Sequence, residues 1–385
     1  MRTLMWCTIG FAVACGLGIA LMASWLWLLG LVCLLFGVCV YVLSLRLNAL
    51  RIGTPVLVGL GIGLLWFGIY SALFYPKQQK MDTPLTLCVQ ISDYSQISSY
   101  GAATDGRLWL DGAMHPVRVF HDATHAFAPG DRVSGNFIVE YCLTDANPYP
   151  KADGIHYTLT LRSDPVVSPA ESLSLLDLPA IWRNTLKEHI DTSLDEQTAA
   201  FCKALLLGDR SGLSYQQETD FRLSGIAHIV AVSGLHVNIL FGLIDLLTAR
   251  RRRVAALLGI PALFLFAAVV GFTPSVTRAC VMQILLLLAS LFRQEYDRPT
   301  ALSFSCLVML VVNPMTLLSV SFQMSVGCII GILLFAKPIY QWFLSEAILD
   351  IGRGNPFSRF CKRWLASSVS VSISTAVITV PLVAY

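Results

Sequence analysis

Residues 4–45 read LMWCTIGFAVACGLGIALMASWLWLLGLVCLLFGVCVYVLSL, a run of 42 residues without a charged side chain. A helix needs about 20 consecutive apolar residues to cross a bilayer. The run therefore predicts two transmembrane helices joined by a tight turn near residues 22–26, where Trp25 and Trp27 suit a membrane interface. A soluble core has no use for an apolar run of this length, so the stretch decides the fold class.

The rest of the chain agrees with a membrane protein. Hydrophobic residues make up 55% of the 385 residues and charged residues only 13%, whereas soluble domains carry about 25% charged residues. Further apolar runs lie at 52–74, 225–247, 254–272, 276–292, 301–312, 317–336 and 364–385. The last run has no stop signal, which predicts a chain that ends inside a transmembrane segment. We expect a mainly α, polytopic membrane protein with nine crossings.

The distribution of Lys and Arg in short loops predicts the orientation. With nine crossings, the basic clusters at 250–253, 293–298 and 353–363 fall on one side together with Arg2, Arg46 and Arg51. The opposite short loops, 271–275 and 313–316, contain no Lys or Arg. We therefore expect a multi-pass protein of the cytoplasmic (inner) membrane, with a cytoplasmic N-terminus and residues 77–222 extracytoplasmic.

The outward segment begins with a β domain. Alternating, β-rich stretches at 84–92, 107–111, 115–121, 131–141 and 155–163 predict five strands, separated by turn pairs such as Asp105-Gly106. Five short strands suit a small OB-like barrel, although an open sandwich has the same pattern. Cys88 and Cys142 are the two cysteines of this domain, and outside the cytoplasm they can form a disulfide. Two separate buried thiols are the alternative.

The second part of the outward segment has helical spacing. Apolar side chains recur among Glu, Lys and Asp at Leu175, Leu178, Ile181, Trp182, Leu186 and Ile190. This pattern predicts an amphipathic helix that lies on the outer leaflet or packs on the barrel. The domains expected are 1–76 (three transmembrane helices), 77–168 (the OB-like domain), 169–224 (amphipathic surface helices) and 225–385 (a transmembrane bundle).

The charge of the outward segment argues against a general nucleic-acid surface. Residues 77–222 contain 12 Lys or Arg and 19 Asp or Glu, a net charge of −7. A nucleic-acid domain usually carries a basic footprint. Contact with DNA would need a local patch or stacking on aromatic side chains. A structural or partner-docking role for the barrel is equally open.

Polar residues interrupt the apolar run at 225–237, which reads GIAHIVAVSGLHV. At 100° per residue, His236 lies about 80° and Ser233 about 140° from His228, so the three share one broad face of a continuous helix. Arg278, near the outer end of its helix, needs an anionic partner, either Asp209 or Asp220 or a phosphate backbone. These groups either brace neighbouring helices or line a polar route.

Three ordered motifs carry a resemblance. Residues 204–237 read ALLLGDRSGLSYQQETDFRLSGIAHIVAVSGLHV, residues 274–279 read PSVTRA, and Asn313-Pro314 is followed by SFQMS at 321–325. In order and spacing they resemble the ComEC family of competence proteins. The resemblance implies a membrane channel component that imports single-stranded DNA during natural transformation, together with other competence-machinery proteins. It implies a DNA path along Asp209, Arg210, His228, Ser233, His236 and Arg278.

The sequence also departs from the family, and two other function classes stay open. Many members carry a metallo-β-lactamase-like domain, but this chain has no HxHxDH run, and its seven histidines are scattered. We therefore expect no nuclease or other enzymatic activity, no metal and no cofactor. The alternatives are an intramembrane serine hydrolase, with Ser233 as nucleophile and His236 as base, and a small-solute transporter. No inverted repeat supports the transporter.

Overall fold

The computed structural model describes residues 3–21, 26–44, 53–74, 81–98, 101–110, 113–122, 124–141, 149–170, 174–224, 232–249, 251–344 and 356–384. The chain divides into two compact units, Met1–Leu318 and Ser319–Tyr385, which we describe separately. Each of the nine apolar runs expected from the sequence contains a helix, and a small β-barrel lies between the third and fourth runs. The predicted fold class is confirmed.

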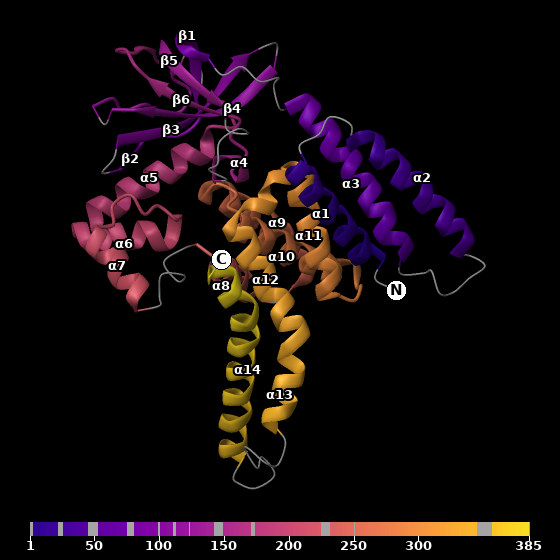
Figure 1. The fold of residues 1–385 in the computed structure, drawn as a ribbon. Helices are drawn as coiled ribbons and strands as arrows, with labels where there is room; N and C mark the ends of the chain where they lie inside the picture. The colour runs from indigo at the N-terminus through magenta and orange to yellow at the C-terminus, as the bar shows by residue number, and fades with distance from the viewer. Residues whose placement is uncertain are drawn as a thin grey trace. The chain divides into compact units, whose positions relative to one another are not determined.

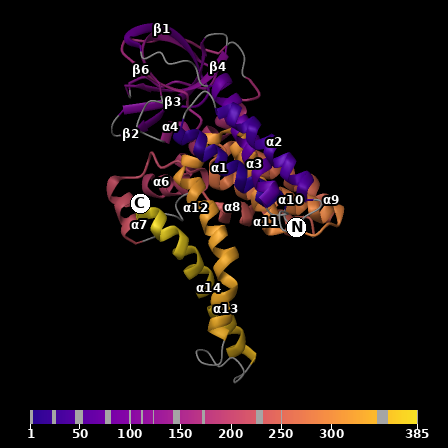
Figure 2. The ribbon, with the colours of Figure 1, turned by 45° about the vertical axis from the view of Figure 1, so that its right-hand side comes forward.

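The first three helices, α1 (Thr3–Leu21), α2 (Leu26–Ser44) and α3 (Gly53–Phe74), lie together (Figures 1 and 2) and pack through glycine. Helix α3 contacts both α1 and α2. A Cβ atom on Gly59 would lie 2.0 Å from the carbonyl oxygen of Cys7 on α1, and one on Gly61 would lie 2.7 Å from the backbone nitrogen of Leu34 on α2. Small residues allow backbones to approach closely in membranes, where apolar side chains gain little by leaving lipid.

Seven strands form the β domain: β1 (Met81–Ile91), β2 (Gln96–Ser98), β3 (Gly101–Leu110), β4 (Ala113–His121), β5 (Arg132–Tyr141), β6 (Tyr157–Leu161) and β7 (Val166–Ser168). Five of them close a barrel in the order β1-β3-β4-β6-β5, with β5 pairing back to β1. All neighbours in the ring are antiparallel except β4 and β6. The expected small barrel is confirmed, and its assignment to the OB class stays a prediction.

The barrel differs from the expected strands at Gly106. The Asp105-Gly106 pair was expected to form a turn, but both residues lie inside β3, where Gly106 pairs with Ile91 and Val117. A Cβ atom on Gly106 would lie 2.9 Å from the carbonyl oxygen of Gln90. Gly106 therefore allows neighbouring strands to approach closely and does not form a turn. Close approach of another backbone is a common reason for glycine inside a strand.

The structure does not confirm the predicted Cys88–Cys142 disulfide. Cys88 is an exposed free thiol, and its partner across the β1–β5 ladder is Ser134. Cys142 lies outside the described residues, so the pairing stays a prediction.

Three helices follow the barrel: α5 (Leu178–Ser193), α6 (Glu196–Leu207) and α7 (Tyr215–Leu223). The expected amphipathic helix is α5, but its charged residues Arg183 and Lys187 lie on the protected side. Arg183 forms an ion pair with Asp93 of the barrel. Trp182 and Leu186 are instead about half exposed. Contact of this apolar face with the outer leaflet, the alternative favoured for this helix, stays a prediction.

The remaining helices of the first unit are α8 (Gly234–Leu247), α9 (Arg252–Val270), α10 (Pro274–Phe292) and α11 (Arg298–Val312), followed by the 3-10 helix η2 (Pro314–Leu318). Helices α8, α9 and α10 share one core, which includes Val237, Leu263, Val276 and Leu287.

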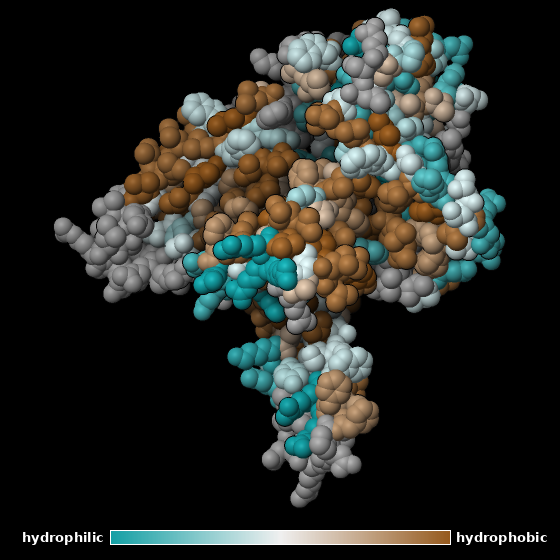
Figure 3. Space-filling view, turned by 180° about the vertical axis from the view of Figure 1, so that it is seen from behind, coloured by the Kyte–Doolittle hydropathy of each residue, from teal (hydrophilic) through white to brown (hydrophobic). Residues whose placement is uncertain are grey.

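Figure 3 shows hydrophobic side chains gathered over the N-terminal helices, at the left of that view. This unsheltered apolar surface is typical of a membrane protein.

The second unit consists of α12 (Val320–Gly331), the π-helical turn η3 (Ile332–Ala336), α13 (Lys337–Leu344) and α14 (Pro356–Ala384). Gly331 lies against α14, because a Cβ atom there would be 2.4 Å from the carbonyl oxygen of Ser374. Among the described residues of both units, six helices are long and apolar enough to cross a membrane. Three shorter apolar helices are Leu26–Val38, Gly234–Leu247 and Arg298–Val312.

Candidate functional site

Helix α8 begins inside the most conspicuous motif of the sequence, and this corrects the expected face. Ser233 has φ −137° and ψ 178°, so it is an extended N-cap residue rather than part of a helix. The 100° spacing used to place Ser233 and His236 on one continuous face is therefore wrong. His228, the third member of that face, lies outside the described residues. The apolar motif contains a helix start, and the polar residues satisfy its free backbone groups.

Ser233 and His236 form a reciprocal capping box. The backbone N–H of Ser233 donates to Nδ1 of His236 at 3.2 Å, and the backbone N–H of Leu235 donates to Oγ of Ser233 at 3.4 Å. A serine hydrolase would instead need the hydroxyl of Ser233 to donate to the imidazole. The geometry gives both residues a role as a helix cap, and the hydroxyl of Ser233 accepts a hydrogen bond from the backbone of Leu235.

Arg278 lies against the same helix start. It belongs to α10, which begins at Pro274, and its Nη2 atom is 3.7 Å from the position that a Cβ atom would take on Gly234. Its Nη1 atom is 3.9 Å from the sulfur of Met282. The first turn of a helix presents free N–H groups and the positive end of the helix dipole. The guanidinium and the start of α8 therefore place positive electrostatic potential in one small region.

The GDRS turn after α6 is the next motif. Gly208 ends α6 with φ 77°, a left-handed conformation that glycine adopts without strain. A Cβ atom there would lie 3.5 Å from a methyl group of Val232, the residue before the N-cap of α8. Three motif segments thus meet near one helix start: the GDRS turn contacts Val232, and PSVTRA contacts Gly234. The SFQMS motif belongs to the second unit.

Asp209 has a different partner from those expected. Its carboxylate accepts from Nζ of Lys187 at 2.6 Å and from the backbone N–H and hydroxyl of Ser211 at 3.0 and 2.7 Å. Burial alone raises the pKa of Asp209, but the bonds from Lys187 and Ser211 outweigh it and lower the pKa to about 2. Asp209 is therefore a charged anchor that ties the turn to α5, and Arg210 is exposed beside it.

Two polar residues that were not predicted as site residues from the sequence also connect α8 and α10. Gln283 of α10 donates a hydrogen bond to the side-chain oxygen of Asn238 of α8. Each is an amide in an apolar helix, and that contrast could have identified the pair from sequence. Within the described residues, no group of three or more His, Cys, Asp or Glu side chains is arranged to hold a metal ion.

Comparison with known proteins identifies the region that contains these motifs. Residues 205–385 match the family described as "Competence protein". The chain is 29% identical to "ComE operon protein 3" of Bacillus subtilis (strain 168) over 204 residues, 51% of this chain and 25% of that protein. It is 32% identical over 157 residues to an "Uncharacterized protein" of Aquifex aeolicus (strain VF5), 40% of this chain and 38% of that protein. No solved structure matches.

Both relatives are longer than the matched region by far, since the chain spans about a quarter of one and about two fifths of the other. The family match begins near the end of α6, just before the GDRS turn, and includes the start of α8, Arg278 and the SFQMS motif. The sequence motifs and the family match therefore agree on the same segment. Residues 205–385 belong to the ComEC family of competence proteins, as the resemblance implied.

Proposed function

We propose that the protein is a channel component for the import of single-stranded DNA during natural transformation. It acts in the cytoplasmic membrane with a cytoplasmic N-terminus, and residues 77–222 face outward. Membership of the competence family and the apolar helices support this proposal. The basic loops on one side support the orientation. Other competence-machinery proteins are its expected partners, and the chain itself has no enzymatic activity.

The observation that carries the proposal is the position of Arg278 against the first turn of α8. Single-stranded DNA carries one negative charge on each phosphate, and an apolar pore offers that charge nothing in exchange for water. A guanidinium beside the positive end of the α8 helix dipole supplies favourable charge at one point. Helix starts of this kind receive anionic groups in many proteins, including membrane transporters.

The other candidate residues take supporting roles. Ser233 and His236 fix where α8 begins, so they set the direction in which its first N–H groups point. Asp209 fixes the adjacent turn, from which Arg210 is exposed. His228 is included in the path through the family motif alone. The small-solute transporter alternative has no comparable observation in its favour.

Substitution of Arg278 tests the proposal. We expect Arg278→Gln to lower transformation at least tenfold while capture of DNA at the cell surface and the amount of protein in the membrane stay normal. Arg278→Lys keeps the charge and should retain part of the uptake. Arg293→Gln, which removes one charge at the opposite end of α10, is the matched control and should leave uptake close to normal.

The amount of variant protein in the membrane distinguishes a transport role of Arg278 from a packing role. If Arg278→Gln lowers uptake only in proportion to the protein in the membrane, Arg278 braces the helices and the proposed path is wrong. Normal uptake at normal abundance would also refute it. Surface capture must be assayed in the same cells, because a fault in capture would lower uptake before the membrane step.

A further inference from the structure

Asn313 occupies the Asn-Pro motif, which the proposed function does not use. It follows the last residue of α11 with φ −146°, so it is extended, and Pro314 begins η2. The side-chain oxygen of Asn313 accepts the backbone N–H of Met315 at 3.0 Å. Asparagine followed by proline is a favourable start for a helix, because the side chain caps a free N–H and proline needs none.

The other end of the same amide reaches a separate element. Its nitrogen donates to the carbonyl oxygens of Ala152 at 3.1 Å and Lys151 at 3.3 Å, at the end of the short helix α4 (Tyr149–Ala152). The hydroxyl of Tyr70 on α3 lies 3.5 Å from the side-chain oxygen of Asn313. Two donors and two acceptor positions are the full capacity of an amide, and Asn313 uses all four.

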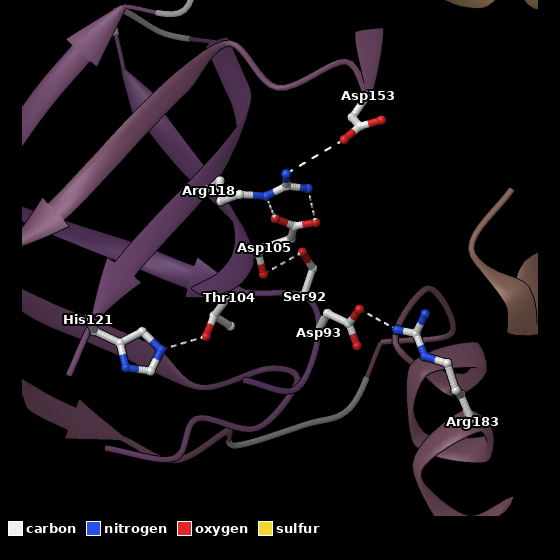
Figure 4. Close-up of polar contacts among 8 residues, drawn as sticks. All are labelled: Ser92, Asp93, Thr104, Asp105, Arg118, His121, Asp153 and Arg183. Atoms are coloured by element: carbon white, nitrogen blue, oxygen red, sulfur yellow. Dashed lines mark hydrogen bonds and ion pairs between the residues drawn. The ribbon is translucent and has the colours of Figure 1, made fainter. Parts of the chain in front are cut away.

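Helix α4 is built into the barrel. The backbone N–H of His156, just after it, donates to the carbonyl oxygen of Pro116 on β4 at 2.9 Å. Arg118 of β4 forms a bidentate ion pair with Asp105 of β3, with bonds of 2.7 and 3.1 Å. The same guanidinium lies 3.6 Å from Asp153, the residue after α4, and Figure 4 shows it between the two carboxylates.

Asn313 therefore joins two bodies that the sequence separates by about 160 residues. On one side are α3, α11 and η2 of the helix bundle, and on the other is the segment that is tied to the barrel through Arg118 and His156. We propose that Asn313 is a positioning residue that docks the barrel onto the helix bundle through the carbonyl groups of α4. This inference concerns the geometry between barrel and bundle, and it does not depend on what passes through the membrane.

The chemistry of the site explains why asparagine is suited to it. Aspartate keeps an oxygen for the N–H of Met315, but it places a carboxylate against two carbonyl oxygens. Serine also caps a helix start but is too short to reach α4. Both changes keep the cap of η2 and remove the docking contact. They separate a docking role from a local folding role.

Distances between barrel and bundle provide the test. Spin labels are attached at cysteines replacing Met114, an exposed residue of β4, and Val32, an exposed residue of α2, in a background without other reactive thiols. The complete chain in lipid nanodiscs should give one narrow distance distribution. We expect Asn313→Asp to broaden it at least twofold, while circular dichroism and the thermal unfolding temperature change little.

Matched variants make the result decisive. Asn184→Asp introduces the same charge on α5, where the side chain is at the surface, and should leave the distribution narrow. Arg118→Met loosens α4 from the barrel side and should broaden it. If Asn313→Asp does not accumulate, Asn313→Ser takes its place. A narrow, unshifted distribution in a folded Asn313 variant would overturn the proposal, as would broadening in Asn184→Asp.

Discussion

Helices α1–α3 and the segment from α5 to α10 hold their elements together in opposite ways. In the first region, glycines bring the backbones of α3 and α1 into contact, and the contacts involve few side-chain polar groups. In the second region, the elements are joined by an ion pair between Lys187 and Asp209, a capping box at Ser233 and an amide pair between Gln283 and Asn238. Both regions include long apolar helices.

The difference indicates which region contains polar groups that could take part in function. Backbone contact across glycine tolerates no added atom, so α1–α3 form a rigid packing unit. Ion pairs and amide pairs instead place charged and polar groups between the helices of the second region. Two of the three motifs of the competence family, at 204–237 and 274–279, fall in the second region.

The largest effect is expected at Gly59. In Gly59→Ala the new Cβ atom would lie 2.0 Å from the carbonyl oxygen of Cys7, and backbone cannot move aside as a side chain can. We expect a loss of stability of about 3 kcal/mol or more, above the usual cost of overpacking, and little protein in the membrane. Quantitative immunoblotting of membrane fractions measures the amount of protein, and thermal unfolding in detergent measures its stability.

Gly242→Ala on α8 is the matched control. No atom lies within 4 Å of a Cβ at this position, so the same added methyl group should be neutral or slightly stabilising, as alanine favours helix over glycine. Equal losses in both variants would mean that the contrast between the two regions is wrong.

A smaller effect is expected at Asp209. The pKa of its carboxyl is lowered to about 2 in the folded protein, below the ordinary value of 3.8, so the charged form contributes stability above pH about 4. The contribution is lost as the pH falls through the folded pKa. Asp209→Asn should cost about 1–2 kcal/mol at pH 7, after allowance for screening at a partly solvated pair.

Thermal unfolding at pH 7 and pH 3 measures this dependence. The difference between Asp209→Asn and the parent protein should shrink at the lower pH, because the carboxyl of the unfolded parent chain binds protons there while the folded one stays mostly charged. Lys187→Met should show a similar loss at pH 7, since it removes the cation of the same pair. A difference that is the same at both pH values would show that charge does not hold this turn.

The smallest effect is expected at the start of α8. Loss of a capping side chain costs about 1 kcal/mol, so Ser233→Ala and His236→Leu should lower stability slightly. His236→Gln keeps an acceptor at the third helical position and should retain the capping box. Comparing stability and DNA uptake in these variants separates the cap from the path. Lost uptake in His236→Gln at normal stability would give the imidazole a role beyond capping.

Part of the site was accessible from sequence and part was not. The motifs containing Gly208, Ser233 and Arg278 could be recognised in order, and they meet in the structure. Their contacts could not be read in advance, because a periodicity of 100° per residue assumes a helix that continues through Ser233. The partner of Asp209 was also missed, since Lys187 lies on another helix that folds back onto the turn.

The sequence by itself determined the membrane class, because long uncharged runs cannot be hydrated and their number and length follow from bilayer thickness. It also determined a small β domain between the third and fourth runs, since alternation with period two predicts strands. Only the tertiary structure decided the start of α8 at Ser233, the ion pair between Lys187 and Asp209 and the contact of Asn313 with α4. These features depend on partners distant in the chain, and the sequence contains the groups but not the distances between them.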